Sequence, residues 1–377
     1  MSSSVIDEST NHLSTNQASS AISHFFPLRI RGIQQETRDA ITLVFDVPPE
    51  WEAQFRFTQG QYVTLRAWIA GEEVRRSYSI CSAVQDAKLR VAIKRAAGGV
   101  FSNWIIDHVK AGDTVEVMPP EGRFHITLSP TTARHYVAFA VGSGITPILS
   151  IVKTTLLAEL QSSFTLFYGN RASSTVMFRE ELAELKDVFL GRFNLIHILS
   201  REHQDVDMLN GRISANKVEQ LLRYFCRFET IDTAFLCGPQ EMVEEVAARL
   251  VELGLPETRI KIELFTVEKS EPRRERHAAE TVAAECQVTL VVDGDTLHYT
   301  MQKNETVLDA ALNRGIDLRH SCKSGVCATC RAKLVEGQVD MDANYALEDY
   351  EIARGFILTC QSYPVSDRIS VDFDQDN

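Results

Sequence analysis

Four cysteines near the C-terminal end of the 377-residue chain carry the clearest chemical signal. Cys322, Cys327 and Cys330 follow the spacing C-x4-C-x2-C, and Cys360 comes after a gap of 29 residues. This spacing is typical of a [2Fe–2S] cluster, in which each of two tetrahedral irons binds two cysteine sulfurs. A zinc site with four cysteine ligands and paired disulfides are the alternatives, but zinc sites usually show two short C-x2-C hooks. The spacing therefore predicts a centre that moves single electrons.

Two motifs in the first third of the chain could bind a flavin nucleotide. In R-S-Y-S, Arg76 can pair with a phosphate, the Tyr78 ring can stack on a flavin, and the Ser79 hydroxyl can bond a ring nitrogen. In G-G-V-F-S, a turn with Gly99 and Ser102 opens a helix, whose backbone N–H groups can hold a pyrophosphate. R-S-Y-S alone could be an ordinary strand with a surface arginine, and the two motifs together favour a flavin site.

A second glycine turn, G-S-G-I-T-P, follows an apolar strand and opens a helix. Such a turn lets the backbone approach the pyrophosphate of a dinucleotide. A plain strand–helix turn is the alternative, because a proline stands where the third glycine of G-x-G-x-x-G would be. The candidate residues are Gly142, Gly144, Thr146 and Pro147.

Residues at the ends of the later strands could select and contact that dinucleotide. Arg171 can meet the 2′-phosphate of NADP or be a solvated loop cation, and Arg179 is a weaker second candidate. The Cys237 thiol, followed by Gly238, can contact a nicotinamide ring or be a buried small hydrophobe. Phe265 follows the fifth strand and either shields the flavin or belongs to the core.

Three folded units must position these residues. Short turn-bounded strands with one helical piece in residues 25–128 predict an antiparallel β-barrel. Strict strand–helix alternation in residues 129–266 predicts a doubly wound parallel sheet, with its ligand at the C-terminal edge of the strands. Residues 285–377 hold the cysteines. We expect a disordered tail at 1–24 and a charged linker at 267–284.

Composition and charge restrict the kinds of partner and the cellular compartment that we expect for the chain. The net charge of −12 argues against nucleic acid, and residues 285–377 hold 16 acidic and 8 basic residues, a net of −8. We expect this acidic unit to dock transiently on a basic partner. No apolar run predicts a membrane span or a secretory signal, and the other cysteines show no pairing pattern, which favours a reducing cytoplasm. The lone histidines, such as His320, are interpreted as surface or satisfied core residues.

Five motifs follow one another along the chain in the order R-S-Y-S, G-G-V-F-S, G-S-G-I-T-P, C-G-P and the four-cysteine motif. With these motifs the chain resembles the ferredoxin–NADP reductase superfamily, in the form with a C-terminal plant-type ferredoxin domain. The resemblance covers everything but the N-terminal tail. It implies FAD in the barrel, NADPH (with NADH as the other possible donor) on the parallel sheet, and the cluster in an α+β ferredoxin domain of the β-grasp type. It implies that Ser79 and Cys237 lie beside the reacting rings.

The resemblance also implies a reaction and a partner. Electrons pass from NADPH to FAD, then to the cluster, then to an external oxygenase component, with a di-iron oxygenase of phenylacetate breakdown favoured as acceptor. A reductase of another oxygenase, a steroid-type hydroxylase or a desaturase is the alternative. A non-catalytic redox sensor would need an output module. The short polar tail is the part of the sequence outside the three units that could supply one, and such a tail seldom forms a folded module, which argues against a sensor.

Overall fold

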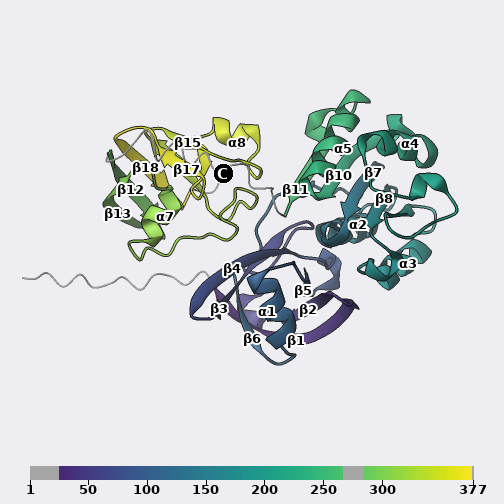
Figure 1. Cartoon of the computed structure of the whole chain (residues 1–377), viewed down its shortest axis with the longest axis horizontal. Coiled ribbons are helices and arrows are strands. Elements are labelled where there is room, and N and C mark those ends of the chain that lie inside the picture. Colours follow the sequence, from purple (N-terminus) through teal and green to yellow (C-terminus); the bar gives the residue numbers. More distant parts are fainter. Residues whose placement is uncertain (1–24, 266–283, 376–377) are drawn as a thin grey trace, which may run out of the picture.

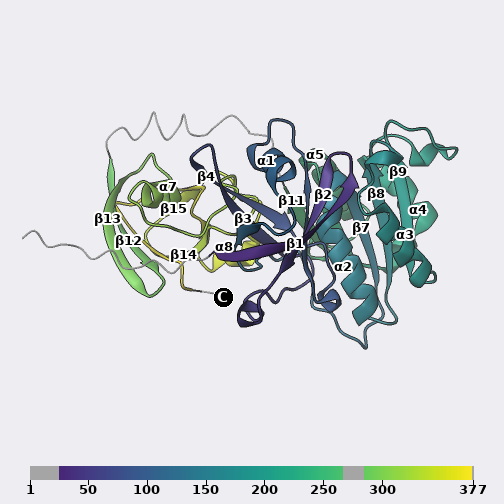
Figure 2. The same cartoon turned by 90° about the horizontal axis from the view of Figure 1, so that it is seen from below.

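The computed structural model describes residues 25–265 and 284–375, which form three domains (Figure 1). The barrel lies at the bottom of the view in Figure 1, with the C-terminal domain at upper left and the parallel-sheet domain at upper right, and Figure 2 shows the same arrangement from below. The expected tail at 1–24 and nearly all of the expected linker at 267–284 lie outside the described residues. These two expectations and the exact domain boundaries stay predictions.

The first domain is an antiparallel sheet of six strands in the order β4-β3-β6-β1-β2-β5. A bridge between Ile80 and Val91 joins the end of β4 to β5 and closes the sheet into a barrel. The sequence pattern did not reveal β1, because Leu28 and Ile30 alternate with exposed arginines and the rest of the strand is mostly polar. The elements are β1 (Phe26–Thr37), β2 (Ala40–Asp46), β3 (Tyr62–Ile69), β4 (Glu72–Ser79), β5 (Leu89–Lys94), α1 (Val100–His108) and β6 (Thr114–Val117).

The second domain is a parallel sheet in the order β11-β10-β7-β8-β9, with helices on both faces. Helices α2 and α3 cover one face and α4 and α5 cover the other, so the doubly wound sheet is confirmed. The direction of winding reverses between β7 and β10, where ligands of such sheets bind. The elements are β7 (His135–Val141), α2 (Ile145–Ala158), β8 (Ser163–Asn170), α3 (Arg179–Val188), β9 (Phe193–Leu199), α4 (Ala215–Phe225), β10 (Ile231–Gly238), α5 (Gln240–Glu252) and β11 (Ile260–Leu264).

The third domain is a mixed sheet in the order β13-β12-β18-β14-β16, beside a small two-stranded sheet of β15 and β17. The parallel pair β12–β18 lies inside the sheet, and α7 packs into its core. The segment between α7 and β14, residues 317–330, carries three of the four cysteines and is called the cluster loop below. The elements are β12 (Glu285–Val292), β13 (Asp295–Gln302), α7 (Val307–Leu312), β14 (Arg331–Glu336), β15 (Val339–Met341), α8 (Asp349–Ala353), β16 (Phe356–Leu358), β17 (Ser362–Pro364) and β18 (Arg368–Asp372).

No helix in the described part of the chain has the length and the apolar run that a membrane crossing requires.

Candidate functional site

The four cysteines of the C-terminal domain lie in two pairs. The sulfurs of Cys322 and Cys327 are 3.1 Å apart, and the thiols of Cys330 and Cys360 are hydrogen-bonded to each other. Within residues 25–265 and 284–375, no three or more metal-ligand side chains surround a single point. A single four-ligand zinc ion needs such a set, whereas a [2Fe–2S] cluster takes two thiolates at each iron. The paired arrangement therefore fits the cluster.

The backbone of the cluster loop is shaped to meet cysteine sulfur. The N–H groups of Ser324 and Cys327 both lie 3.4 Å from the sulfur of Cys322. The hydrogen bond from the Cys327 thiol, followed by these N–H groups, lowers the pKa of Cys322 in spite of its burial, which favours the thiolate that binds iron. Gly325 has a φ of +77°, and a Cβ there would lie 2.9 Å from the carbonyl oxygen of Ala343. This turn therefore requires glycine.

The R-S-Y-S motif lies on β4, where alternate side chains point to opposite faces. Tyr78 is half-buried and its ring centroid lies 5.9 Å from that of Phe101 on α1. Arg76 is exposed and donates to the carbonyl of Arg75 at 2.7 Å. Ser79 is buried and belongs to the opposite face. The structure thus brings Arg76 and Tyr78 to one face beside α1, where a flavin ring and a phosphate could lie.

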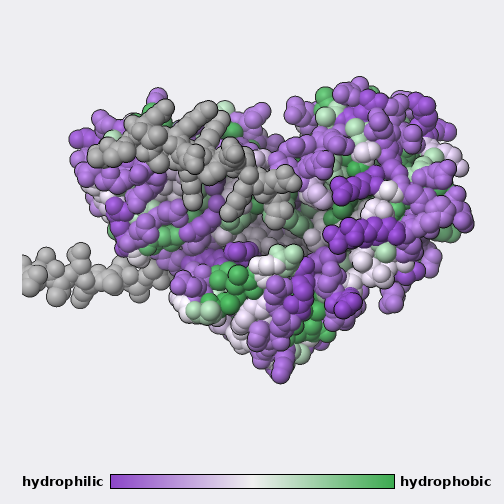
Figure 3. Space-filling model, in the orientation of Figure 1, coloured by the Kyte–Doolittle hydropathy of each residue, from purple (hydrophilic) through white to green (hydrophobic). Residues whose placement is uncertain are grey.

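The G-G-V-F-S turn is tightly folded at the start of α1. A Cβ on Gly99 would lie 2.6 Å from the Ser102 hydroxyl oxygen, so a larger residue would clash. Ser102 itself accepts a hydrogen bond from the N–H of Ala96 at 3.2 Å. The Ser102 hydroxyl therefore fixes the turn. Val100 next to it is exposed, and Figure 3 shows hydrophobic residues gathered on the barrel near α1.

The G-S-G-I-T-P turn packs directly on the end of β10. A Cβ on Gly144 would lie 2.2 Å from the carbonyl oxygen of Cys237, so glycine is required at this contact. Gly142 has a φ of +57°, and its carbonyl accepts a hydrogen bond from the Tyr168 hydroxyl at 3.0 Å. The turn and the Cys237–Gly238 strand end thus meet at the point where the winding of the sheet reverses.

Two further residues of this turn stabilise the beginning of α2. The Thr146 hydroxyl donates to the carbonyl of Ser143 at 3.0 Å. Pro147 is buried in the first turn of the helix, where a missing N–H costs no hydrogen bond. Both residues hold the turn in place, and the N–H groups at the start of α2 remain the groups that could bind phosphate.

Ser79, Cys237 and Glu263 converge from three strands of two domains. Ser79 donates to a Glu263 carboxylate oxygen at 3.0 Å, and Glu263 pairs with Cys237 across β10 and β11. Burial raises the pKa of Glu263 to about 8, although the Ser79 hydrogen bond opposes part of this shift. Burial, reinforced by the Glu263 charge, raises the pKa of the Cys237 thiol, which is therefore neutral. The three side chains form an uncharged polar group at neutral pH.

Sequence reasoning singled out Ser79 and Cys237 and missed Glu263. The available signal was a carboxyl residue near the C-terminal end of the last parallel strand, the edge at which Cys237 also lies. Phe265 directly follows that strand and is 36% exposed. It therefore lies at the rim of this site and outside the apolar cores.

Arginines from three segments line the edge beyond β8 and β9. Arg171 follows β8 and is exposed, and its carbonyl accepts a hydrogen bond from the N–H of Arg201 at 2.8 Å. Arg179 is the first residue of α3, and after the hydrogen bonds from Ser173 its charge helps to lower the pKa of the Glu202 carboxyl. Sequence reasoning missed Arg201, although its position two residues after the end of β9 resembles that of Arg171 after β8. The structure brings Arg171 and Arg201 together.

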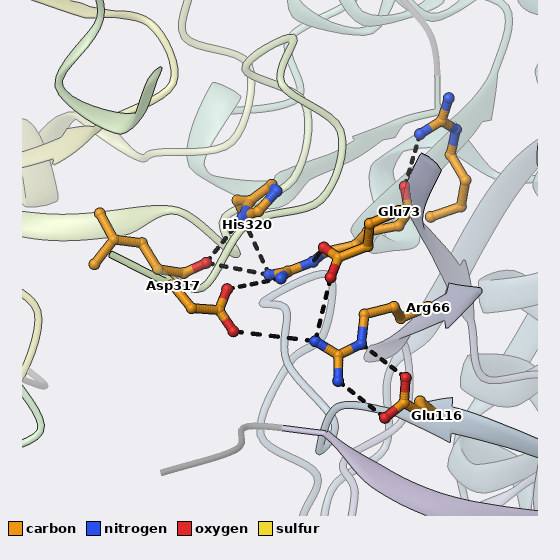
Figure 4. Close-up of polar contacts among 8 residues, drawn as sticks. Arg66, Glu73, Glu116, Asp317 and His320 are labelled. Atoms are coloured by element: carbon orange, nitrogen blue, oxygen red, sulfur yellow. Dashed lines mark hydrogen bonds and ion pairs between the residues drawn. The ribbon is translucent and has the colours of Figure 1, made fainter. Parts of the chain in front are cut away.

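Arg75 precedes the predicted Arg76 in the sequence and joins the barrel to the cluster loop by binding Asp317 and His320, which are labelled in Figure 4. One terminal nitrogen lies 2.7 Å from a carboxylate oxygen of Asp317. The other donates to the carbonyl of Leu318 at 3.2 Å and lies 3.1 Å from His320 Nδ1. Arg75 is 5% exposed, and His320 is buried, as expected for a satisfied histidine. Figure 4 also shows Arg66 and Glu116 of the barrel beside this contact.

Acidic residues of the C-terminal domain also contact the other two domains. Glu351 is 1% exposed and pairs with Arg123 of the barrel domain and, at 3.3 Å, with Arg331. Glu348 pairs with Lys261 on β11 at 3.4 Å. Part of the acidic surface therefore faces this chain's own domains.

Comparisons with known families match all three domains. Residues 27–126 match "Oxidoreductase FAD-binding domain", residues 139–248 match "Oxidoreductase NAD-binding domain", and residues 290–365 match "2Fe-2S iron-sulfur cluster binding domain". FAD, a nicotinamide nucleotide and a [2Fe–2S] cluster are thus the groups that the three domains take.

Whole-chain relatives share this three-domain arrangement. The chain is 42% identical to one of the subunits of the 1,2-phenylacetyl-CoA epoxidase of Escherichia coli (strain K12), over 93% of this chain and 98% of the relative. It is 34% identical to "3-ketosteroid-9-alpha-monooxygenase, ferredoxin reductase component" of Mycobacterium tuberculosis (strain ATCC 25618 / H37Rv), over 93% and 97%. Among solved structures, phthalate dioxygenase reductase has the same fold, with a TM-score of 0.56 and 24% identity over 93% of this chain and 98% of that chain.

Proposed function

The chain belongs to the reductase components of oxygenase systems, which pass electrons from NAD(P)H through FAD to a [2Fe–2S] cluster, and we propose that its acceptor is the di-iron oxygenase that epoxidises phenylacetyl-CoA. The observation that carries the proposal is the 42% identity to a component of such an epoxidase over nearly the whole of both chains. The steroid monooxygenase reductases reach 31–34% over similar lengths. A reductase of a steroid-type hydroxylase is therefore the second candidate.

When bound, FAD accepts a hydride and releases electrons singly, and the cluster carries one electron at a time. The chain's own residues position these groups. We assign the flavin to Arg76 and Tyr78 on one face of β4 and to Ser79, which lies on the other face but is the last residue of this strand, with the turn at Gly99 and Ser102 holding its pyrophosphate. We assign the nicotinamide nucleotide to the edge that the G-S-G-I-T-P turn and Gly238 form. Support comes from the meeting of these segments where β7 and β10 end.

Ser79, Glu263 and Cys237 would act beside the reacting rings. In the structure Ser79 donates to Glu263, but with a pKa of about 8 Glu263 is largely protonated at neutral pH, so its own O–H can donate a hydrogen bond to the Ser79 oxygen instead. The Ser79 hydroxyl is then free to donate to a flavin ring nitrogen. The neutral thiol of Cys237 adds no charge near the nicotinamide ring. Phe265, at the rim, would cover the flavin until the nucleotide binds.

The preference for NADPH is assigned to Arg171, supported by Arg201 beside it. Loss of one charge-assisted hydrogen bond costs roughly 1.5–3 kcal/mol, so Arg171→Ala should raise the Michaelis constant for NADPH about tenfold or more and leave that for NADH nearly unchanged. Arg223→Ala, which removes an exposed arginine from α4 of the same domain, is the matched control. Equal effects of Arg171→Ala on both nucleotides would show that Arg171 is structural.

The acceptor is tested with purified proteins. The protein is reduced anaerobically with NADPH and mixed with a panel that contains the di-iron phenylacetyl-CoA oxygenase, a steroid hydroxylase and a desaturase. We expect the di-iron oxygenase to be reduced fastest and to form epoxide in proportion to NADPH used. Faster reduction of the steroid hydroxylase would favour the second candidate, and failure to reduce any oxygenase would favour a redox sensor.

Two further features of the proposal concern docking and compartment. The net charge of −8 on residues 285–377 supports transient electrostatic docking on a basic oxygenase surface. Glu348 already pairs with Lys261, so exposed residues such as Asp349 would serve this docking. None of the eight cysteines, all of which the structure describes, forms a disulfide, which supports a reducing cytoplasm as the site of the reaction.

A further inference from the structure

Tyr62 begins β3 at the place where the barrel faces the cluster loop. It lies directly opposite Ser79 in the β3–β4 pair, so the two side chains share one face of the sheet. Its backbone N–H and carbonyl both bond Glu121, each at 2.8 Å. A Cβ on Gly122 would lie 2.9 Å from the Tyr62 ring. The ring is therefore held from two sides, and its direction is set by the barrel.

The Tyr62 hydroxyl leaves the barrel and reaches the third domain. It lies 3.1 Å from the hydroxyl oxygen of Thr329, a residue 267 positions later in the chain. Both side chains are buried, with 7% and 3% of their surfaces exposed. Thr329 stands between Cys327 and Cys330 in the sequence, and its hydroxyl interacts with the Cys327 side chain. A hydrogen bond and a neighbouring side-chain contact thus lead from the flavin-domain strand to a cluster ligand.

Two neighbouring contacts fix the same loop against the same strands. The hydroxyls of Ser77 and Ser321 are 2.9 Å apart, and Arg75 binds Asp317 at 2.7 Å. Arg75 and Ser77 alternate along β4 on the face that also carries Ser79. The cluster loop is therefore seated on the strand that carries the flavin-site serine.

We propose that Tyr62 is a positioning residue for electron transfer from the flavin to the cluster. It fixes the cluster loop through Thr329, and by the same hydrogen bonds it raises the reduction potential of the cluster while the third domain is docked. The inference does not depend on which oxygenase accepts the electron.

The direction of the effect follows from charge. Reduction adds negative charge to the cluster, and hydrogen bonds donated toward its sulfurs stabilise that charge and raise the potential. When Tyr62 donates to the Thr329 oxygen, the Thr329 proton points to the Cys327 sulfur and its hydrogen bond is strengthened. Docking therefore makes the cluster a better acceptor, and release of the domain makes it a stronger donor to the partner.

The test is Tyr62→Phe in the full-length holoprotein. The midpoint potential of the cluster is measured by anaerobic redox titration, with the paramagnetic signal of the reduced cluster as the readout. We expect a lower potential than in the parent, together with flavin-to-cluster transfer slower by about two- to tenfold, the range that loss of one neutral hydrogen bond gives. The flavin absorbance and the rate of hydride transfer from NADPH should not change.

Tyr299→Phe is the matched control. Tyr299 lies on β13 of the third domain, and its buried hydroxyl has no hydrogen-bond partner among the residues described. Its loss should leave the potential and both transfer rates unchanged. A shift as large as that of Tyr62→Phe would show that any buried phenol has this effect, and would overturn the proposal.

A double variant tests the route through Thr329. Thr329→Val removes the hydroxyl that links Tyr62 to Cys327, whereas Thr329→Ser keeps it and should keep the parental potential. In the Thr329→Val background, Tyr62→Phe should cause no further shift in potential. A parental potential in Tyr62→Phe, a shift that persists without the Thr329 hydroxyl, or loss of bound flavin would each overturn the proposal.

Discussion

The barrel meets its two neighbouring domains in different ways. Against the parallel-sheet domain it shares a single apolar core, which joins Ala40, Cys81 and Phe124 of the barrel domain to residues of β7, β10 and α2. The Phe124 ring lies edge-on to Phe235 of β10, with centroids 5.7 Å apart. Separating these domains would expose apolar surface to water, so this interface holds the flavin and nucleotide sites in a fixed relation.

Against the C-terminal domain the barrel makes mainly polar contacts. The apolar core described for the C-terminal domain contains residues from 286–373 only. Val326 of the cluster loop packs against the apolar core of the parallel-sheet domain. The contacts that join the barrel to the loop are Arg75–Asp317, Ser77–Ser321 and Tyr62–Thr329. The two hydroxyl–hydroxyl contacts each contribute about 0.5–1.5 kcal/mol and the charged Arg75–Asp317 contact roughly 1.5–3 kcal/mol, because water can replace such partners when the interface opens. The difference indicates one permanent interface and one that can open to present the cluster to an oxygenase.

The largest expected effect comes from removing the polar interface altogether. A chain that ends at Phe265 keeps the barrel, the parallel sheet and their shared core. It should still reduce ferricyanide with NADPH at the parental rate, whereas reduction of cytochrome c and of the oxygenase should be lost. Rapid-mixing absorbance measurements compare the two reactions. Oxygenase reduction by the shortened chain would mean that the cluster is not the electron exit.

The apolar interface is tested by Phe124→Ala, which should destabilise the protein by about 3–5 kcal/mol, as other large-to-small core substitutions do. It should also slow hydride transfer from NADPH, because the two sites lose their fixed relation. Thermal unfolding followed by flavin fluorescence measures the first effect, and single-turnover flavin reduction measures the second.

Phe55→Ala is the control for this variant, since Phe55 is buried in the barrel core against Phe26. It should lower the thermal midpoint and leave hydride transfer nearly intact. Equal slowing of hydride transfer by both variants would show that the effect of Phe124→Ala comes from lost stability and not from the interface.

A smaller effect is expected from pH at the same interface. The folded-state pKa of Glu263 is raised by burial from 4.5 to about 8, so the folded protein holds a proton that the unfolded chain releases. The stability linked to Glu263 is therefore fully present below about pH 4.5 and is lost as pH rises through about 8.

Glu263→Gln should remove this part of the decline in thermal midpoint between pH 5 and 9. Glu241→Gln, on the exposed first turn of α5, is the control and should keep the decline. An identical slope in Glu263→Gln and the parent would show that Glu263 is ionised in the folded protein.

The smallest expected effect is the loss of one ion pair at the polar interface. Asp317 is 40% exposed, so Asp317→Asn should change the thermal midpoint little. It should slow flavin-to-cluster transfer several-fold at low salt, and the difference from the parent should shrink as salt screens the pair. Asp367→Asn removes the same charge from an ion pair with Lys303 inside the C-terminal domain and should leave the rate unchanged. Equal slowing by both would point to net charge and away from this contact.

Much of the fold was available from local sequence. Apolar alternation and turn residues predicted the barrel strands other than β1, and the strand–helix alternation predicted the doubly wound sheet. The apolar pattern predicts a strand at Phe193–Leu199 and a helix at Ala215–Phe225, and β9 and α4 have these bounds. The cysteine spacing predicted the cluster. These features depend on residues near one another in the chain, where periodicity and turn chemistry act directly.

The tertiary structure alone decided which residues meet between domains. Glu263 is one carboxyl residue among many in the sequence, and it becomes a half-buried, mostly protonated partner of Ser79 because two domains share a core. Tyr62 and Thr329 lie 267 residues apart in the sequence and meet only in the folded protein. Arg75 and Arg76 are neighbours, one step apart on one strand. That step turns one arginine to the cluster loop and leaves the other exposed, because side chains alternate between the faces of a sheet and the packing of a distant domain decides which face is buried.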